Sequence, residues 1–250
     1  MSSSRSLWLI YILTVYVLLF FPLIIQAQIS VSDIEKLLLT SNESPIYSYY
    51  DSLFQSELQI IDGRLHSDRY PSGTGHPFYL SRESVPGTIL YEGRVYKYSF
   101  IRYDILNDIL QIHHFSRTGS YIIDLNTQKI NAFRLNGHTF IRLSSSISSG
   151  SRIEDGFYEL VYNGETKYWL KWEKNFVNRT VESAGEFETV KTRYLSRDGN
   201  WYRITNRFSL LKAFSDKKDE VRDYLKTARI SVRVATDDEL KTVLKHCDSL

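Results

Sequence analysis

The feature that most constrains the fold is a series of short turn signals between runs of aromatic and β-branched residues. Glu92-Gly93, Asn136-Gly137, Asn163-Gly164 and Asp198-Gly199 each separate two such runs. An Asn-Gly or Asp-Gly pair between hydrophobic runs is the strongest local signal for a β-hairpin, because both residues tolerate a positive φ. Short connections also make neighbouring strands antiparallel. The sequence therefore predicts a mostly antiparallel β protein.

The best-patterned segment runs from Gly87 to Phe115. It reads as three strands joined by two turns, over Thr88–Tyr91, Val95–Tyr103 and Ile109–Phe115. Because strand side chains alternate between faces, three aromatic residues of the middle run are predicted to share one face and belong to the core: Tyr96, Tyr98 and Phe100. Ahead of it, Tyr47–Ile61 is predicted to be loop and weak strand, Tyr70–Pro77 loop, and Phe78–Leu80 a short strand.

After Phe115 the same pattern continues. Asn136-Gly137 would place Phe133 directly opposite Phe140, as a cross-strand aromatic pair. We expect about ten strands, all joined by hairpins. From about residue 207 the apolar spacing becomes helical, with a break near Ser215-Asp216 and a capping box at Thr236–Glu239. The predicted fold class is α+β, predominantly antiparallel β. It is a meander or half-barrel of about ten strands with a C-terminal helical pair packed on it.

The amino terminus has the pattern of a targeting segment. Arg5 precedes the charge-free run Leu7–Ile25, and small Ala27 then precedes Gln28. This order is typical of a secretory signal peptide over residues 1–27. The alternative is a transmembrane anchor, since the run approaches the roughly 20 residues that span a bilayer. Pro22 and the polar exit favour cleavage. Residues 28–250 are predicted to form a single domain, which begins with a helix capped by Ser32 and Glu35 and ending near Leu39.

Composition narrows the function classes. The net charge of +2 gives no field that would attract nucleic acid or an anionic membrane. The single cysteine, Cys247, excludes a disulfide within the chain, and its place on an apolar helical stripe predicts a buried thiol.

Several groups of polar residues are candidate sites. His113 and His114 are adjacent on a strand, so they point to opposite faces and do not share a metal. Asp104 and Asp108 flank a turn, and the segment lacks the ligand density of a calcium loop. Turn chemistry is the favoured role for both aspartates.

The loop-rich segment before the central strands offers His66, Asp68 and His76, in the kind of place where catalytic residues occur. A hydrolase site over His66–His76 is one alternative, although no catalytic motif supports it. The Ser-Gly-Thr-Gly run at 72–75 lacks the Lys-Ser/Thr of a phosphate-binding loop.

Aromatic residues offer a further candidate, a ligand platform formed by Tyr168, Trp169, Trp172 and Trp201. At least one face of this group is expected to be core. Asn42 and Asn178 begin glycosylation sequons. The sequence predicts no catalytic, cofactor-binding or metal-binding residue, and no cofactor.

Several short motifs resemble a family of uncharacterised exported proteins of Bacteroidota. They are the Gly75-His76-Pro77-Phe78 turn, the hairpin at Tyr91-Glu92-Gly93, the later Tyr103-Asp104, and the helical ending around Leu211–Phe214. The resemblance spans most of the chain after residue 27. It implies a location in the bacterial envelope, periplasmic or at the cell surface, and no assigned activity.

The leading prediction is an exported, non-enzymatic envelope protein that binds or scaffolds. One alternative is a periplasmic carrier of a hydrophobic ligand, which would have a large apolar cavity between sheet and helices. The other is the secreted hydrolase with a site near His66–His76. The expected partners are an envelope protein or a hydrophobic ligand, with no nucleic acid. Membrane contact is expected only through the N-terminal segment, if that segment is not cleaved.

Overall fold

The structure is a computed structural model that describes residues 30–40, 63–67, 73–116, 119–145, 153–178 and 185–250. The predicted signal peptide and the segment Tyr47–Ile61 lie outside these residues. The chain divides into Met1–Ser30 and a second unit, Val31–Leu250, which holds the fold described below. No helix of the described residues is long and apolar enough to cross a membrane.

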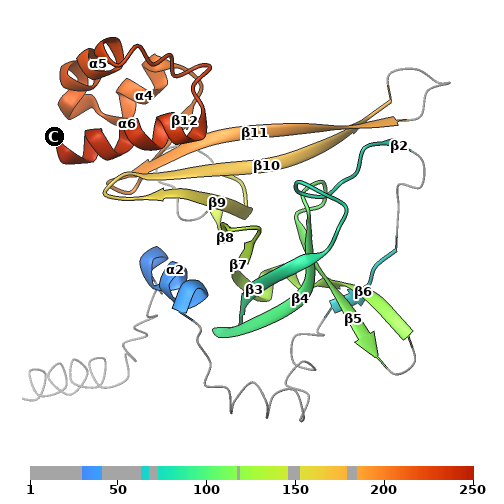
Figure 1. Cartoon of the computed structure of the whole chain (residues 1–250). Coiled ribbons are helices and arrows are strands. Elements are labelled where there is room, and N and C mark those ends of the chain that lie inside the picture. The colour runs from blue at the N-terminus through green and yellow to red at the C-terminus, as the bar shows by residue number, and fades with distance from the viewer. Residues whose placement is uncertain (1–29, 41–62, 68–72, 117–118, 146–152, 179–184) are drawn as a thin grey trace, which may run out of the picture. The chain divides into compact units, whose positions relative to one another are not determined.

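Among the described residues of the second unit, one mixed sheet of twelve strands dominates (Figure 1). Its order is β1-β6-β5-β4-β3-β7-β8-β9-β10-β11-β12, with all neighbours antiparallel, and β2 pairs in parallel with β11. The predicted α+β class with mainly antiparallel sheet is confirmed. The strands are β1 (Gly63–Leu65), β2 (Gly73–Thr74), β3 (Val85–Tyr91), β4 (Arg94–Asp104), β5 (Ile109–Ser116), β6 (Gly119–Leu125), β7 (Ile130–Leu135), β8 (His138–Leu143), β9 (Gly156–Asn163), β10 (Lys167–Val177), β11 (Gly185–Arg197) and β12 (Asn200–Ile204).

The prediction that hairpins join all strands is wrong at three connections of the described strands: β1 pairs with β6, β2 pairs with β11, and β7 does not pair with β6. The chain leaves β6 through the 3-10 turn η2 (Thr127–Lys129) and pairs β7 with β3, not with β6. Two meanders, β3–β6 and β7–β12, therefore meet at the β3–β7 pair. No local turn signal encodes this pairing, because β3 and β7 are separated in the sequence by three other strands.

Two segments before β3 also differ from the prediction. The predicted loop Tyr70–Pro77 contains β2, which pairs with Gly185 and Glu186 of β11. The predicted strand Phe78–Leu80 is reduced to an isolated bridge between Phe78 and Asp104. Leu80 has a positive φ of 55°, which ends any extended run there.

The turn signals are mostly confirmed in detail. Asn136 and Gly137 have φ of 51° and 82°, and Phe133 faces Phe140 with ring centroids 4.8 Å apart. Glu92-Gly93 and Asp198-Gly199 likewise have a positive φ at both residues. The β9–β10 hairpin is different, because Asn163 pairs with Lys167 and the loop has three residues.

A β-bulge in β4 changes which side chains face the core. Val85 pairs with Ile101 and Gly87 with Tyr98, so the single residue Pro86 of β3 lies opposite two residues of β4, Ser99 and Phe100. An extra residue of this kind reverses the alternation of side chains beyond it.

Because of this bulge, the three aromatic residues predicted to share one core face lie on two different faces of the sheet. Tyr96 and Tyr98 are partly buried against the core, whereas Phe100 lies on the opposite face with 43% of its surface exposed. The prediction for Phe100 is wrong for this reason.

The sheet curls so that β4–β6 fold over its middle strands (Figure 1). Tyr103 of β4 lies 5.2 Å, centroid to centroid, from Phe140 of β8, although β3 and β7 separate these strands in the sheet. The rings of Phe133 and Phe157 complete this aromatic core. The sheet remains open, with β1 and β12 as its end strands. The inner face of β4–β6 is thereby buried, and their outer face is left for other contacts.

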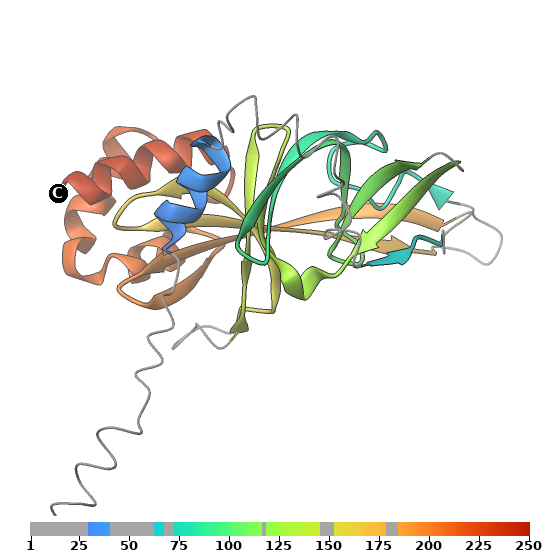
Figure 2. The same cartoon turned by 90° about the horizontal axis from the view of Figure 1, so that it is seen from below.

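Helices cover both faces of the other end of the sheet (Figure 1, Figure 2). Tyr168 and Leu170 of β10 pack against the C-terminal helices, and Trp169 points to the other face, where α2 (Val31–Thr40) packs through Ile34 and Leu38. The C-terminal part has three α-helices in place of the predicted pair: α4 (Arg207–Ala213), α5 (Lys218–Thr227) and α6 (Asp237–Ser249).

The ends of the helices show how well capping was predicted. Thr236 and Glu239 form the predicted capping box of α6, with Glu239 Oε2 accepting from the Thr236 amide at 2.7 Å. A 3-10 turn, η4 (Ser215–Lys217), marks the predicted break between α4 and α5. Helix α2 begins at Val31, so Ser32 lies inside it and is not its cap.

Candidate functional site

A row of polar side chains crosses the outer face of β4, β5, β6 and β1. The strand register places Arg102 opposite Gln111, Gln111 opposite Asp124, and Asp124 opposite Arg64. The first two pairs are hydrogen-bonded and the third is an ion pair. Arg102 Nε donates to Gln111 Oε1 at 2.7 Å, Gln111 Nε2 donates to Asp124 Oδ1 at 2.7 Å, and Arg64 Nε lies 3.8 Å from Asp124 Oδ2. We call these four residues the polar row.

The middle of the polar row is unusually buried for a sheet face that does not belong to the core. Gln111 is 1% exposed and Asp124 is 9% exposed. A buried carboxylate is costly unless hydrogen bonds compensate its desolvation. Here the amide of Gln111 and the ring of His66 supply those bonds.

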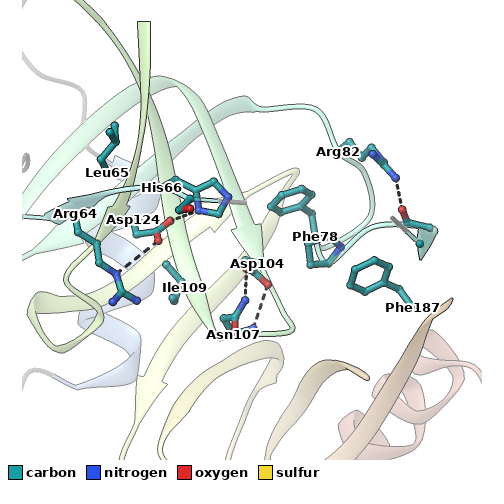
Figure 3. Close-up of a pocket in the computed structure, with 14 residues that line it drawn as sticks. Arg64, Leu65, His66, Phe78, Arg82, Asp104, Asn107, Ile109, Asp124 and Phe187 are labelled. Atoms are coloured by element: carbon teal, nitrogen blue, oxygen red, sulfur yellow. Dashed lines mark hydrogen bonds and ion pairs between the residues drawn. The ribbon is translucent and has the colours of Figure 1, made fainter. Parts of the chain in front are cut away.

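His66 follows β1 and is held over Asp124. Its amide donates to the Ile122 carbonyl at 2.8 Å, and its Nδ1 lies 2.9 Å from Asp124 Oδ1 (Figure 3). Gln111 Nε2 is 2.8 Å from the same ring nitrogen. Because an ionised carboxylate can only accept, the contact with Asp124 requires the proton on Nδ1, and Gln111 Nε2 then donates to Asp124 and not to the ring. In this tautomer Nε2, on the other side of the ring, carries the lone pair of the imidazole.

The loop before β3 forms a wall of the site. The guanidinium of Arg102 lies 3.9 Å from the ring centroid of Phe78, in a cation–π contact. Lys174 of β10 fixes this loop, since its Nζ donates to the carbonyl oxygens of His76 at 2.6 Å and of Phe78 at 2.9 Å. Burial lowers the pKa of Lys174, with Arg82 adding to the shift.

These elements enclose a pocket of about 160 Å³. Its lining includes Arg64, Asp104 and Asp124 of β1, β4 and β6, together with His66 after β1, Phe78 and Arg82 of the loop before β3, and Phe187 of β11 (Figure 3). Figure 3 shows Arg64 and Arg82 at well-separated ends of the pocket. Arg82 donates to the carbonyl oxygen of Gly75. The pocket is thus lined by both arginines and by two carboxylates that already have donors.

Both carboxylates that line the pocket, Asp104 and Asp124, already accept hydrogen bonds from the protein. Asp104 accepts from the amides of Leu106 and Asn107 at 2.9 Å and 3.1 Å, and from Asn107 Nδ2 at 2.8 Å. These are the bonds of a turn, as predicted for this residue. Asp108 points elsewhere, to the ammonium of Lys171 at 3.2 Å.

The loop histidines predicted as candidates are separated by the structure. His66 lines the pocket, whereas His76 is turned to Lys174, whose Nζ lies 3.3 Å from His76 Nδ1. Burial and the neighbouring cations Lys174 and Arg82 lower the pKa of His76. Asp68 and Ser72 lie outside the described residues, as do Asn42 and part of the sequon that begins at Asn178.

The remaining candidates of the sequence, the adjacent histidines, the Tyr and Trp group and Cys247, do not line the pocket. His113 faces Phe115 on the outer side of β5, and His114 faces the other side, opposite Tyr121. Tyr168, Trp169 and Trp201 are buried, so they do not form an exposed platform, and Trp172 is partly buried between two cores. Burial raises the pKa of Cys247 to about 12, which fits the predicted inert thiol.

Sequence reasoning located the loop at His66 but missed its partners. Gln111 and Asp124 interrupt the apolar runs Ile109–Ile112 and Ile122–Leu125, and that interruption was the available signal. Polar residues at alternate strand positions are ordinarily solvent-facing, so the signal did not distinguish a site. Among the described residues, no group of three or more His, Cys, Asp or Glu side chains is arranged to hold a metal ion.

Comparison of the chain with protein-family models, with curated proteins and with solved structures finds no match. The site is therefore interpreted from its own geometry.

Proposed function

We propose that the protein is an exported binding protein whose pocket over β4–β6 takes a small anionic group, such as a carboxylate. The observation that carries this proposal is the group of Arg64, His66 and Asp124, which lines the pocket, with Asp124 also held by buried Gln111. Polar groups placed in this way fix a ligand's orientation in many binding sites. Export is supported by the charge-free run Leu7–Ile25 alone.

The balance of hydrogen-bond donors and acceptors in the pocket predicts the sign of the ligand's charge. Asp104 and Asp124 each receive at least two hydrogen bonds from the protein. Arg64 directs only its Nε toward Asp124 and keeps 65% of its side chain exposed. A guanidinium has five N–H donors and no acceptor. Arg64 and Arg82 therefore leave donors for a ligand that brings acceptor oxygens, and a carboxylate matches that geometry best.

A carrier of hydrophobic ligands is less well supported. Such a carrier needs an apolar cavity between sheet and helices. In the described residues this interface is filled by a core that includes Phe214, Val221, Val243 and Leu244, each at most 1% exposed. The pocket with the polar row lies on a different part of the sheet and is not apolar.

Isothermal titration calorimetry tests the proposal with D-galacturonate and with D-galactose, which has the same ring without the carboxylate. We expect galacturonate to bind and galactose to bind at least about tenfold more weakly, the difference made by one charge-assisted contact. Arg64→Gln should weaken galacturonate binding about tenfold. Arg222→Gln, a surface arginine of α5 paired with Asp219, is the matched control and should bind normally. Inorganic phosphate and sulfate complete the panel. If none of these anions binds, the proposal is wrong.

Export is tested separately, by determining the amino terminus of the protein recovered from the cell envelope. A terminus at Gln28 supports cleavage of residues 1–27. An intact Met1 would show that the segment is kept as an anchor.

A second function, acid–base hydrolysis, is favoured by the His66–Asp124 pair. An Asp that accepts from Nδ1 orients the imidazole and leaves Nε2 as a base toward bound water. The test is hydrolysis of p-nitrophenyl acetate and of a p-nitrophenyl galacturonide by the wild type and by His66→Gln. Turnover that disappears in His66→Gln while galacturonate still binds would replace the binding proposal with the enzymatic one. Equal background rates in both proteins would support binding alone.

A further inference from the structure

A second pocket lies where the middle strands β3, β4 and β7 meet the turn between β7 and β8. It encloses about 450 Å³, and its lining includes Thr88, Lys97, Arg134, Asn136 and Gly137. Among the described residues, none lines both this pocket and the pocket over β4–β6. We call it the basic pocket, because its charged lining residues are one lysine and one arginine.

The strand register places the two cations on either side of Thr88. Thr88 of β3 pairs with Lys97 of β4 on one side and with Arg134 of β7 on the other. Residues directly opposite each other in antiparallel strands share a face, and neighbouring strands are about 4.8 Å apart. The two side chains therefore start roughly 10 Å apart on one face, with the Thr88 hydroxyl between them. This arrangement suits a ligand group that sits above Thr88 and is held from both sides.

The positive charge of the basic pocket is not balanced by the protein. No aspartate or glutamate is among its described lining residues. Neither Lys97 nor Arg134 has an ion pair or a side-chain hydrogen bond in the part of the chain that the structure describes. The pocket over β4–β6 differs, because two carboxylates lie there among the arginines. The basic pocket therefore holds two positive charges that an anion from outside the fold can neutralise.

A turn and a backbone irregularity shape the basic pocket. Gly137 has a φ of 82°, and a Cβ atom added there would meet nothing within 4 Å, so the turn leaves open space beside the pocket. The β-bulge between β3 and β4 falls at Pro86, another lining residue. Bulges are frequent beside functional sites, where they interrupt the regular pairing of strands. Asn136 of the turn brings a side-chain amide, which is a further hydrogen-bond donor.

We infer that the basic pocket binds a doubly charged phosphate group, either as the free ion or as a phosphate monoester. A phosphate monoester carries a charge of about −1.5 to −2 at pH 7, which matches the two unbalanced cations. The planar guanidinium of Arg134 suits two phosphate oxygens at once, and the ammonium of Lys97 acts as a point charge. The Thr88 hydroxyl is a donor for a further oxygen. This site is independent of the proposed pocket over β4–β6.

The test titrates the isotopically labelled full chain with inorganic phosphate and with glycerol 3-phosphate at low ionic strength. Two-dimensional NMR of the backbone amides follows the binding. We expect saturable shifts at the amides of Thr88 and Gly137. Arg134→Gln should weaken binding about tenfold, through the loss of one charge-assisted contact. Lys97→Gln should weaken it about threefold, because Lys97 is exposed and its charge is screened by solvent.

A surface arginine and two further anions provide the controls. Arg222→Gln changes an arginine of α5 that pairs with Asp219, and this variant should bind phosphate as the wild type does. Sulfate, which is also doubly charged, should shift the same amides. Acetate should bind there at least about tenfold more weakly, since its single charge leaves one cation unpaired. Circular dichroism verifies that both pocket variants are folded.

The outcomes keep the two sites apart. The inference is wrong if phosphate causes no saturable shift at Thr88 and Gly137, or if folded Arg134→Gln binds it as tightly as the wild type. Phosphate shifts confined to Arg64 and His66 would also overturn it, and would support anion binding over β4–β6. Tighter binding of glycerol 3-phosphate than of inorganic phosphate would identify an ester as the ligand, and equal affinity would identify the phosphate group alone.

Discussion

Gln111 and Asp124 face each other across β5 and β6, and the amide donates a 2.7 Å hydrogen bond to a carboxylate that is almost completely buried. Gln111→Leu keeps the volume of the side chain and removes this donor. We expect the free energy of unfolding to fall by about 2–3 kcal/mol, since a buried charged acceptor loses a partner. Urea denaturation monitored by circular dichroism measures the change.

Gln128→Leu provides the control for that substitution. Gln128 is exposed in η2, so its replacement should change stability by less than about 0.5 kcal/mol. Equal effects of the two substitutions would show that the polar row makes no special contribution to the fold.

The contact between His138 and Glu159 predicts a pH dependence of stability. His138 Nδ1 lies 2.6 Å from Glu159 Oε1, and this hydrogen bond raises the pKa of His138 although partial burial opposes it. Because the folded-state pKa is raised, the stabilisation is fully present below about pH 6.5, the unfolded value. It is lost as pH rises through the folded pKa. Since His138 is 42% exposed, we expect no more than about 1 kcal/mol.

The measurement is the difference in unfolding free energy between wild type and His138→Asn from pH 5 to pH 9. Subtracting the variant removes the contributions of the other histidines. The difference should be largest at pH 5 and decline above pH 6.5. Glu159→Gln should abolish this decline, because the charge that favours the imidazolium is gone. A difference that grows with pH would contradict the assignment.

Much of the sheet follows from local chemistry. The paired positive φ values at Asn136-Gly137 and Asp198-Gly199 are what such dipeptides favour, and they fix the register that sets Phe133 against Phe140. The β3–β7 pairing is non-local and has no such signal. It depends on burying Ile89 and Leu90 on the two faces of the middle of the sheet, which only the assembled fold allows.

The site was harder to predict than the sheet for a related reason. His66 was singled out for its loop, but its partners Gln111 and Asp124 lie 45 and 58 residues further along the chain. Their meeting requires the β1–β6–β5 order, in which the first described strand pairs with the sixth. The position of Phe100 required the bulge in β4, and strict alternation placed this residue on the wrong face.

Gly137 provides a test of the turn argument that is free of packing effects. Its φ is 82°, and a Cβ atom added there would meet no other atom within 4 Å. Gly137→Ala should therefore destabilise the protein by about 1 kcal/mol through backbone conformation alone. Gly137→Asn should cost less, because asparagine tolerates the left-handed region. Thermal unfolding of the two variants tests this order, and an asparagine variant less stable than the alanine variant would contradict it.

The thiol of Cys247 is expected to be unreactive until the protein unfolds. Cys247 is fully buried in the apolar face of α6, and burial raises the pKa of its thiol to about 12. The thiolate is the species that reacts with Ellman's reagent, so neither access nor ionisation is available at pH 8. Because the chain has one cysteine, the labelled fraction measured against urea concentration should follow the unfolding transition seen by circular dichroism. Full labelling in the absence of urea would show that α6 opens independently of the sheet, which its shared core with β10 and the stacking of His246 on Tyr224 of α5 argue against.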